Sequence, residues 1–105
     1  MPADPVREIV LAFVRLHILS HALDGPAYGV GLMRTLLHDG YAVGPGTLYP
    51  ALHALESAGF LESEAVRWEG RWRRVYRTTK SGARLLREGR RKAEGLLKNI
   101  AERPA

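Results

Sequence analysis

The sequence predicts a mainly α-helical protein with one small β-hairpin: a winged helix-turn-helix domain followed by a C-terminal dimerisation helix. Two observations support this fold class. Hydrophobic residues recur at helical spacing in three segments before Gly59 and in one after Thr79. Between them, two strand-like runs rich in β-branched and aromatic residues meet around Glu69-Gly70. Three helices, a hairpin and a last helix describe a winged helix-turn-helix module. A plain α+β domain is the alternative, and the basic tip of the hairpin counts against it.

Composition and charge narrow the class of protein. The 105 residues suit one domain, and 46% hydrophobic and 26% charged residues are typical of an ordered soluble protein. The apolar run "IVLAFVRLHIL" is too short to cross a bilayer, so we expect a cytoplasmic protein without membrane contact. Residues 1–66 hold three basic and seven acidic residues, whereas residues 67–105 hold thirteen basic and four acidic ones. A basic half of this kind attracts a polyanion, although a charge run alone more often marks a solvated surface.

Two helices are expected before the third. Asp4 followed by Pro5 is typical of a helix start, because aspartate caps free amides and proline tolerates the first helical position. Glycine and proline in "LDGP", at 23–26, end this helix, whose broad apolar surface predicts burial, in part against a second subunit. A second helix runs from about Tyr28 to His38. Its apolar residues at helical spacing are Gly29, Leu32, Met33, Leu36 and Leu37.

The third helix starts near Pro45 or Gly46, ends at Gly59 and contains a proline. Its inner face should consist of Leu48, Ala51, Leu52 and Leu55, and its outer face of Thr47, Tyr49, Pro50, His53 and Ala54. A proline in a helix interior costs about 3 kcal/mol, and the cost is smaller near the start. The flat ring of Pro50 would also leave the outer surface free of a long side chain.

The outer face of the third helix is the candidate DNA-reading surface. Gly44 and Gly46 allow backbone amides to approach a phosphate at a helix N-terminus that favours anions. Tyr49 and His53 can donate to phosphates or reach base edges. Spacing alone leaves open a second interpretation, in which Tyr49 covers the second helix.

The hairpin carries arginines and two tryptophans. The arginines on or near it are Arg67, Arg71, Arg73, Arg74 and Arg77. Trp68 and Trp72 flank the turn, and we expect them to brace the hairpin as a cross-strand pair, with stacking on a sugar or an effector as the alternative.

The last helix is expected from a cap at Thr79 through Arg103, with an uneven, coiled-coil-like apolar stripe. We therefore expect residues 1–79 to form the DNA-binding domain and residues 80–105 a dimerisation helix within the same compact unit. The candidate dimer contacts are Phe13, Leu86, Ala93, Leu96, Leu97 and Ile100.

Two segments carry a resemblance to a known family. "PGTLYPALHALESAGFL" and "RRVYRTTKSGARLL" closely resemble the PadR family of bacterial transcriptional regulators. Residues 45–59 satisfy the family pattern Pro-Gly-Thr-Leu-Tyr-Pro-x-Leu-x-x-Leu-Glu-x-x-Gly throughout, and the likeness spans roughly residues 8–90. Val30 and Thr78 replace the usual tyrosine and leucine, which suggests altered core packing. Gly44 replaces the usual polar residue, so one helix cap and phosphate contact is missing.

The resemblance implies a homodimeric repressor of the short-tailed branch, released from DNA by an effector. Its recognition helices would enter successive major grooves of a palindromic double-stranded DNA operator, its wings would touch the flanking backbone, and its last helix would mediate dimerisation. The DNA-binding residues would be Gly46, Thr47, Tyr49, Pro50, His53, Arg71, Arg73, Arg74 and Arg77. Some members of the family bind flat effectors through a tryptophan on the last helix. This chain has no aromatic residue after Tyr76, so that mode is not carried over.

Other chemistries find less support in the sequence. His17 and His21 lie four residues apart, which is a metal-ligand spacing, but the chain has no cysteine and Asp24 is near only in sequence. We therefore expect no metal site and no cofactor. The serines form no nucleophile motif and no phosphate loop is present, so we do not expect an enzyme. The remaining alternative to a DNA-binding regulator is a winged-helix module that dimerises or binds a protein without specific DNA binding.

Overall fold

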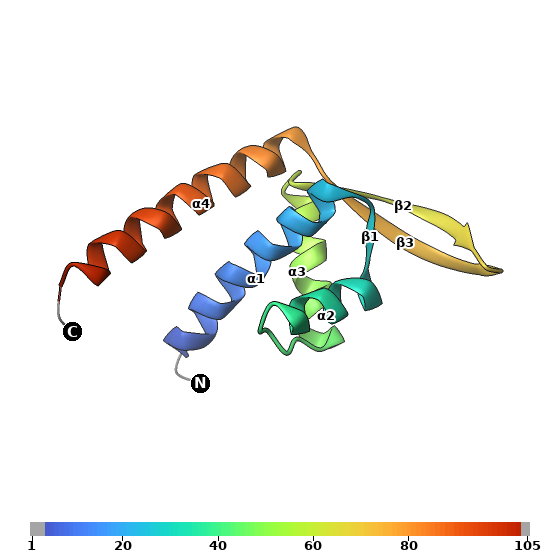
Figure 1. Cartoon of the computed structure of the whole chain (residues 1–105). Helices are drawn as coiled ribbons and strands as arrows, with labels where there is room; N and C mark the ends of the chain where they lie inside the picture. The colour runs from blue at the N-terminus through green and yellow to red at the C-terminus, as the bar shows by residue number, and fades with distance from the viewer. Residues whose placement is uncertain (1–3, 104–105) are drawn as a thin grey trace.

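The computed structural model describes residues 4–103, which form four helices and a three-stranded antiparallel sheet (Figure 1). The elements in chain order are α1 Pro5–Asp24, β1 Ala27–Tyr28, α2 Gly29–His38, α3 Pro45–Ser57, β2 Leu61–Trp68, β3 Arg71–Thr78 and α4 Lys80–Ala101. Over the described residues, no helix is both long enough and apolar enough to cross a membrane. The mainly helical fold with one hairpin is the predicted one.

The helix boundaries follow from local chemistry. Asp4 accepts hydrogen bonds from the amides of Val6 and Arg7, which confirms the predicted cap of α1. Pro45 occupies the first turn of α3, where its missing amide costs little. The turn between β2 and β3 has positive φ at both Glu69 and Gly70, as a two-residue hairpin turn requires.

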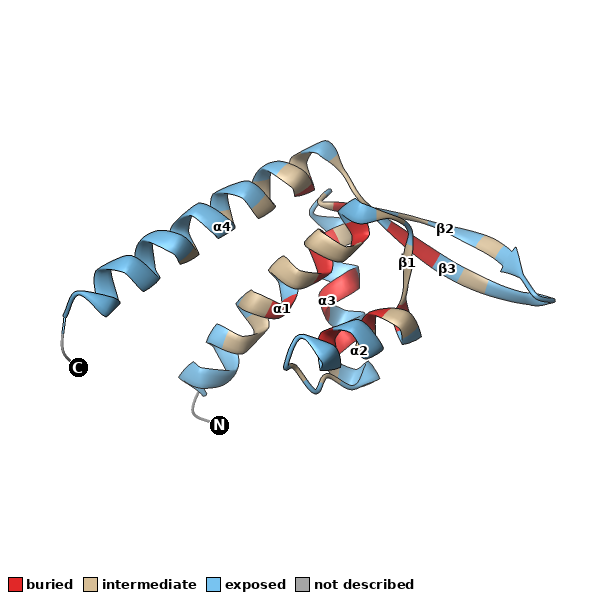
Figure 2. Cartoon of the chain, in the orientation of Figure 1, coloured by how far each residue is buried: buried red, intermediate tan, exposed pale blue. Residues whose placement is uncertain are grey.

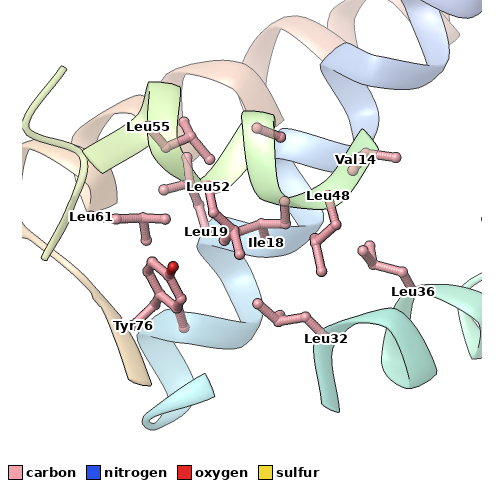
Figure 3. Packing of buried hydrophobic residues seen from close by; sticks show 12 residues of the cluster. Val14, Ile18, Leu19, Leu32, Leu36, Leu48, Leu52, Leu55, Leu61 and Tyr76 are labelled. Carbon is pink, nitrogen blue, oxygen red and sulfur yellow. The ribbon is translucent and has the colours of Figure 1, made fainter. Parts of the chain in front are cut away.

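The core lies where α1, α2 and α3 meet the base of the wing, which is the hairpin of β2 and β3 (Figures 2 and 3). α3 contributes its predicted inner face, while β2 and β3 contribute Leu61 and Tyr76. The largest fully buried side chains are Val14, Ile18, Leu19, Leu32, Leu36, Leu48, Leu52 and Leu61. Burying such residues contributes about 1.5 to 3 kcal/mol each, so this cluster fixes the orientation of α3.

A short strand that the sequence did not suggest links the helix-turn-helix to the wing. β1 pairs with β3, with Ala27 opposite Tyr76 and Tyr28 opposite Val75, and the sheet order is β1-β3-β2. The expected inward packing of Leu37 on α2 is wrong, because this side chain is exposed. The buried residues of α1 lie from Val14 onward, and Val6 and Ile9 face solvent in the single chain, so the expected burial against a second subunit stays a prediction.

The start of α4 is fixed to the end of α3. The Thr79 hydroxyl accepts a hydrogen bond from the Gly82 amide at 3.1 Å and donates one to the Gly59 carbonyl at 2.6 Å. Ser81 donates to the same carbonyl at 2.9 Å. Gly82 is the buried residue of α4, and a Cβ there would overlap the carbonyl oxygen of Phe60. Thr79 therefore caps α4, and Gly82 allows the first turn of this helix to pack closely against the backbone of Phe60.

Candidate nucleic-acid interface

The first turn of α3 presents backbone amides without a competing cap. Gly44 precedes the helix and supplies no side-chain hydrogen bond. The polar N-cap that is usual in the family is therefore missing here, as the sequence predicted. The Gly44 carbonyl accepts from the amides of Thr47 and Leu48 at 3.1 and 2.9 Å. Gly46 has open space where a Cβ would stand. Its amide lies at a helix N-terminus, which is a favourable place for an anion such as a phosphate.

One face of α3 is open to solvent. Tyr49, Pro50 and His53 are exposed and Thr47 is half-buried, whereas the leucines on the other side lie in the core. The structure thus brings together the five residues predicted on this helix, with Gly46 at its start. Pro50 lacks the amide that would bond to the Gly46 carbonyl, and its ring points away from the core.

Tyr49 has two surroundings at once. Its side chain is 44% exposed, yet its hydroxyl end lies against Gly29, the first residue of α2. A Cβ on Gly29 would come within 2.7 Å of Cζ and 2.9 Å of Cε1 of the tyrosine ring. The hydroxyl end of the Tyr49 ring therefore covers α2, as the second interpretation expected. The side chain as a whole remains partly open to solvent.

Arg7 joins this surface from α1. Its Nη2 donates to Thr47 Oγ1 at 3.5 Å, across forty residues of sequence. This residue was not predicted as a site residue, because Arg7 is an isolated cation in an acidic half of the chain. Its side chain is exposed and adjacent to the start of α3, so it adds a positive charge beside the N-terminus of that helix.

The wing arginines divide between the two faces of the sheet. Opposite pairs in the register include Ser63 with Tyr76, Ala65 with Arg74, and Val66 with Arg73. Since side chains alternate along a strand, Arg74 shares the face of Tyr76 and α3. Arg71, Arg73 and Arg77 lie on the opposite face.

Arg74 is connected to α3 by a chain of hydrogen bonds. Its Nη1 donates to Ser63 Oγ at 3.1 Å, and Ser63 Oγ donates to the Glu56 carboxylate near the end of α3. Beside this chain, burial raises the pKa of the Tyr76 phenol above its ordinary value, with a further contribution from the charge of Glu56. The wing and α3 therefore form one polar unit on the face that carries Arg74.

Two arginines of the opposite face have partners inside the chain. The Arg73 guanidinium lies over the Tyr28 ring at 4.7 Å, and its buried Nε has no hydrogen-bond partner among the residues that the structure describes. Arg77 lies 3.8 Å from Glu64 in an ion pair. Arg71 is the first residue of β3, beside the turn at the tip of the wing, and it is exposed. The four arginines predicted as DNA contacts thus have different surroundings in the folded chain.

The predicted pairing of Trp68 with Trp72 is wrong. Trp68 lies opposite Arg71 and Trp72 opposite Arg67, so the two indoles project from opposite faces. Arg67 lies over the Trp72 ring at 5.7 Å. Both tryptophans are strongly exposed, at 62% and 68%. The cross-strand contact near the turn is therefore between Arg67 and Trp72 and not between the two tryptophans.

The predicted dimer contacts gather along α1 and α4. A groove of about 410 Å³ runs between the two helices, and five of the candidate residues line it: Phe13, Leu86, Ala93, Leu96 and Leu97. Ile100, one turn further on α4, is also exposed. Figure 2 shows α4 mostly exposed, with its buried and half-buried residues toward the start of the helix, and Ala93 is the last half-buried one. This apolar surface has no covering element within the described part of the chain.

The winged-helix fold and the exposed face of α3 are together typical of a transcriptional regulator. Residues 18–88 match the transcriptional regulator PadR-like family. The chain is 50% identical over 95 residues to the transcriptional regulator Rv3488 of Mycobacterium tuberculosis, covering 90% of this chain and 89% of that protein. This chain therefore belongs to the PadR-like family of transcriptional regulators.

Solved structures agree with this assignment. A PadR family transcriptional regulator from Eggerthella lenta is 34% identical, with a TM-score of 0.77 over 92% of this chain and 89% of that one. A transcriptional regulator from Clostridium thermocellum is 26% identical, with a TM-score of 0.82 over 90% of this chain and 96% of that one. The predicted fold class and the resemblance drawn from the two sequence segments are both confirmed.

Proposed function

We propose that this chain is a homodimeric repressor that binds a palindromic duplex DNA operator in the cytoplasm and is released by an effector. The observation that carries the proposal is the presence of two separate surfaces on one fold. The open face of α3 and the basic wing form the first, and the apolar groove between α1 and α4, which is lined by other residues, forms the second. A DNA-binding surface that is separate from a dimer surface allows two copies to bind one duplex.

The DNA contacts would come from residues 1–79. In the proposed complex, Gly46, Thr47, Tyr49 and His53 meet the major groove, and the flat ring of Pro50 permits close approach. Arg71 and Arg74 meet the flanking phosphates. Arg73 and Arg77 were also predicted to bind DNA, but their internal partners favour a supporting role in the wing.

The dimer would be held by residues 80–105 together with α1. Leu96, Leu97 and Ile100 are each at least half exposed. Burying such side chains against a second copy contributes about 25 cal/mol per Å² of apolar surface. A two-fold axis through this groove would pair each half-site of an inverted repeat with one α3 and one wing.

The assembly is tested by light scattering. Leu97→Glu places a charge in the groove and should yield a folded monomer, whereas Lys98→Glu on the exposed side of the same turn should remain dimeric. Full-length protein that is monomeric at micromolar concentration would overturn the dimer.

The DNA function is tested by selecting bound sequences from random duplex DNA. We expect an inverted repeat with half-site centres about 10 base pairs apart, and an affinity that falls steeply with salt. Failure to enrich any sequence, with a weak salt dependence, would favour the winged-helix interaction module instead. Effector release is tested by adding candidate small molecules to the repressor–operator complex.

A further inference from the structure

Two histidines on α1 and one aspartate at the end of α2 meet at a single point. His17 Nδ1 lies 3.1 Å from Asp39 Oδ2, and His21 Nε2 lies 2.7 Å from the same oxygen. The three donor atoms all lie within 4.8 Å of one another. The two imidazole rings are stacked with centroids 6.4 Å apart. Asp39 supplies the carboxylate that spacing along the sequence could not identify.

The backbone holds these donors in place. His17 and His21 share one face of α1 because residues four apart lie one above the other on a helix. Asp39 is the C-cap of α2, and its amide donates to the Thr35 carbonyl at 3.0 Å. The ring of Tyr41 packs on His17 with centroids 5.0 Å apart. Little rearrangement is needed to bring the donors to a common distance from an ion.

The donor spacing suits a small divalent ion. Zinc bonds of 2.0 to 2.1 Å to nitrogen and oxygen place tetrahedral ligands roughly 3.3 Å apart, which falls inside the range observed here. Two imidazoles and one carboxylate favour zinc, cobalt(II) or nickel(II), whereas calcium and magnesium prefer oxygen ligands alone. Three protein ligands would leave a further position for water or another donor.

An ion pair is the competing explanation for the same geometry. The His21 hydrogen bond lowers the pKa of the Asp39 carboxyl, with smaller contributions from the charges of His17 and His38. One histidine suffices for that hydrogen bond, however, and a second imidazole nitrogen faces the same oxygen. A carboxylate oxygen can accept an N–H from each imidazole, so the metal titration described below distinguishes the ion pair from a metal site.

We propose that His17, His21 and Asp39 form a binding site for a divalent transition-metal ion of the zinc class, and that this ion alters DNA binding. The regulatory half rests on the proposed repressor function. The ion would join α1 to the turn between α2 and α3, and α3 carries the DNA-reading face. His17 and Tyr41 also line the α1–α4 groove, so the site lies between the two proposed surfaces.

Binding is tested first without DNA. Full-length metal-free protein is titrated with Co²⁺ and Zn²⁺ by visible absorption and calorimetry, with Mg²⁺ as the negative control. We expect one ion per chain for both transition metals and none for Mg²⁺. His17→Gln, His21→Gln and Asp39→Asn should each weaken binding at least about tenfold. The matched control His38→Gln, which changes the histidine next to Asp39 but outside the donor set, should bind like the unmodified chain.

A measurement on the unmodified chain tests the metal site without requiring that any variant folds. Zinc should shift the imidazole nitrogen NMR signals of His17 and His21 and leave those of His38 and His53 in place. Unshifted His17 and His21 signals at saturating zinc, or equal affinity in Asp39→Asn and the unmodified chain, would overturn the site.

The regulatory half is tested on a selected operator with saturating Zn²⁺ and with a chelator. A change in affinity of about fivefold or more, absent in Asp39→Asn, supports it. Equal affinities overturn the regulatory role and leave the metal site standing. If no duplex is bound under either condition, the proposed repressor function fails, while the cobalt spectra still decide the metal site.

Discussion

The ring of Tyr49 lies over Gly29, in the space that a Cβ on that glycine would occupy. α3 and the first residue of α2 are therefore in contact through a side chain that is also open to solvent. Any side chain at position 29 must move Tyr49, and this makes the pair a direct probe of how the proposed DNA-reading face is shaped.

Gly29→Ala should turn the Tyr49 ring outward. Alanine favours a helix over glycine by about 0.5 to 1 kcal/mol, but the displaced ring loses its packing on α2. In a Tyr49→Ala background the same substitution meets no ring, so only the helical gain remains. Denaturant unfolding of the four proteins should give a coupling free energy of about 0.5 to 3 kcal/mol. Additive effects would mean that the two residues do not constrain each other.

Tyr49→Phe removes one hydroxyl and tests whether it contacts DNA. We expect operator binding to weaken by about 0.5 to 1.5 kcal/mol, the size of one hydrogen bond, while the free energy of unfolding stays within about 0.5 kcal/mol of the unmodified value. The two quantities are measured on the same preparation. Lower stability with unchanged affinity in the folded fraction would show that Tyr49 only covers α2.

Arg71→Ala and Arg73→Ala should have different effects, although the residues lie two apart. Arg71 is exposed at the tip of the wing, so its loss should weaken binding to all duplexes about equally and lower the salt slope by about 1. Arg73 covers Tyr28, so its loss should reduce stability by about 0.5 to 2 kcal/mol. Salt-dependent affinities and denaturant unfolding of both variants distinguish the roles. A changed sequence preference in Arg71→Ala would instead indicate base contact.

Gly82→Ala and Gly95→Ala test the junction of α4 with the sheet. Both residues are helical, but a Cβ at position 82 would overlap the Phe60 carbonyl, whereas position 95 has open space. We expect Gly82→Ala to destabilise by about 1 to 3 kcal/mol, because backbone must move. Gly95→Ala should be neutral or stabilising by up to about 1 kcal/mol. Similar unfolding midpoints for the two variants would contradict the close approach seen at Gly82.

Stability should fall at alkaline pH because of Tyr76. Burial and the Glu56 charge raise the pKa of its phenol above 10.0 in the folded chain, with Arg74 opposing them. The contribution of the protonated phenol is therefore fully present below pH 10 and is lost as the pH rises through the folded pKa. Tyr76→Phe should flatten this alkaline decline, with pH 7 as the reference. A decline of equal slope in both proteins would exclude Tyr76 as its source.

Much of the fold was predictable because local chemistry and tertiary packing agree. Asp4, Pro45, Gly59 and Thr79 mark helix boundaries by rules that depend on near neighbours alone. The inner face of α3 followed from helical periodicity. β1 was missed because two residues are too short for any alternation, and its pairing with β3 depends on the tertiary structure.

The site was less predictable because its chemistry depends on which face of the sheet each side chain occupies. Arg73 and Arg74 are neighbours in sequence, yet one packs on Tyr28 and the other reaches Ser63. Arg7 beside Thr47, and Asp39 beside the two histidines, are contacts between distant segments. No spacing rule within one helix or one hairpin reveals such contacts.

From residue 87 onward α4 contains no buried residue within the described chain, whereas α3, the proposed DNA-reading helix, is held by its buried inner face. In the proposed homodimer, α4 determines which subunit the chain pairs with, and α3 determines which operator it binds. A duplicated gene could therefore diverge along the outer half of α4 and stop forming mixed dimers with its parent, at little cost to folding. Related regulators in one cell would then be kept apart by their last helix before their operators had diverged at all.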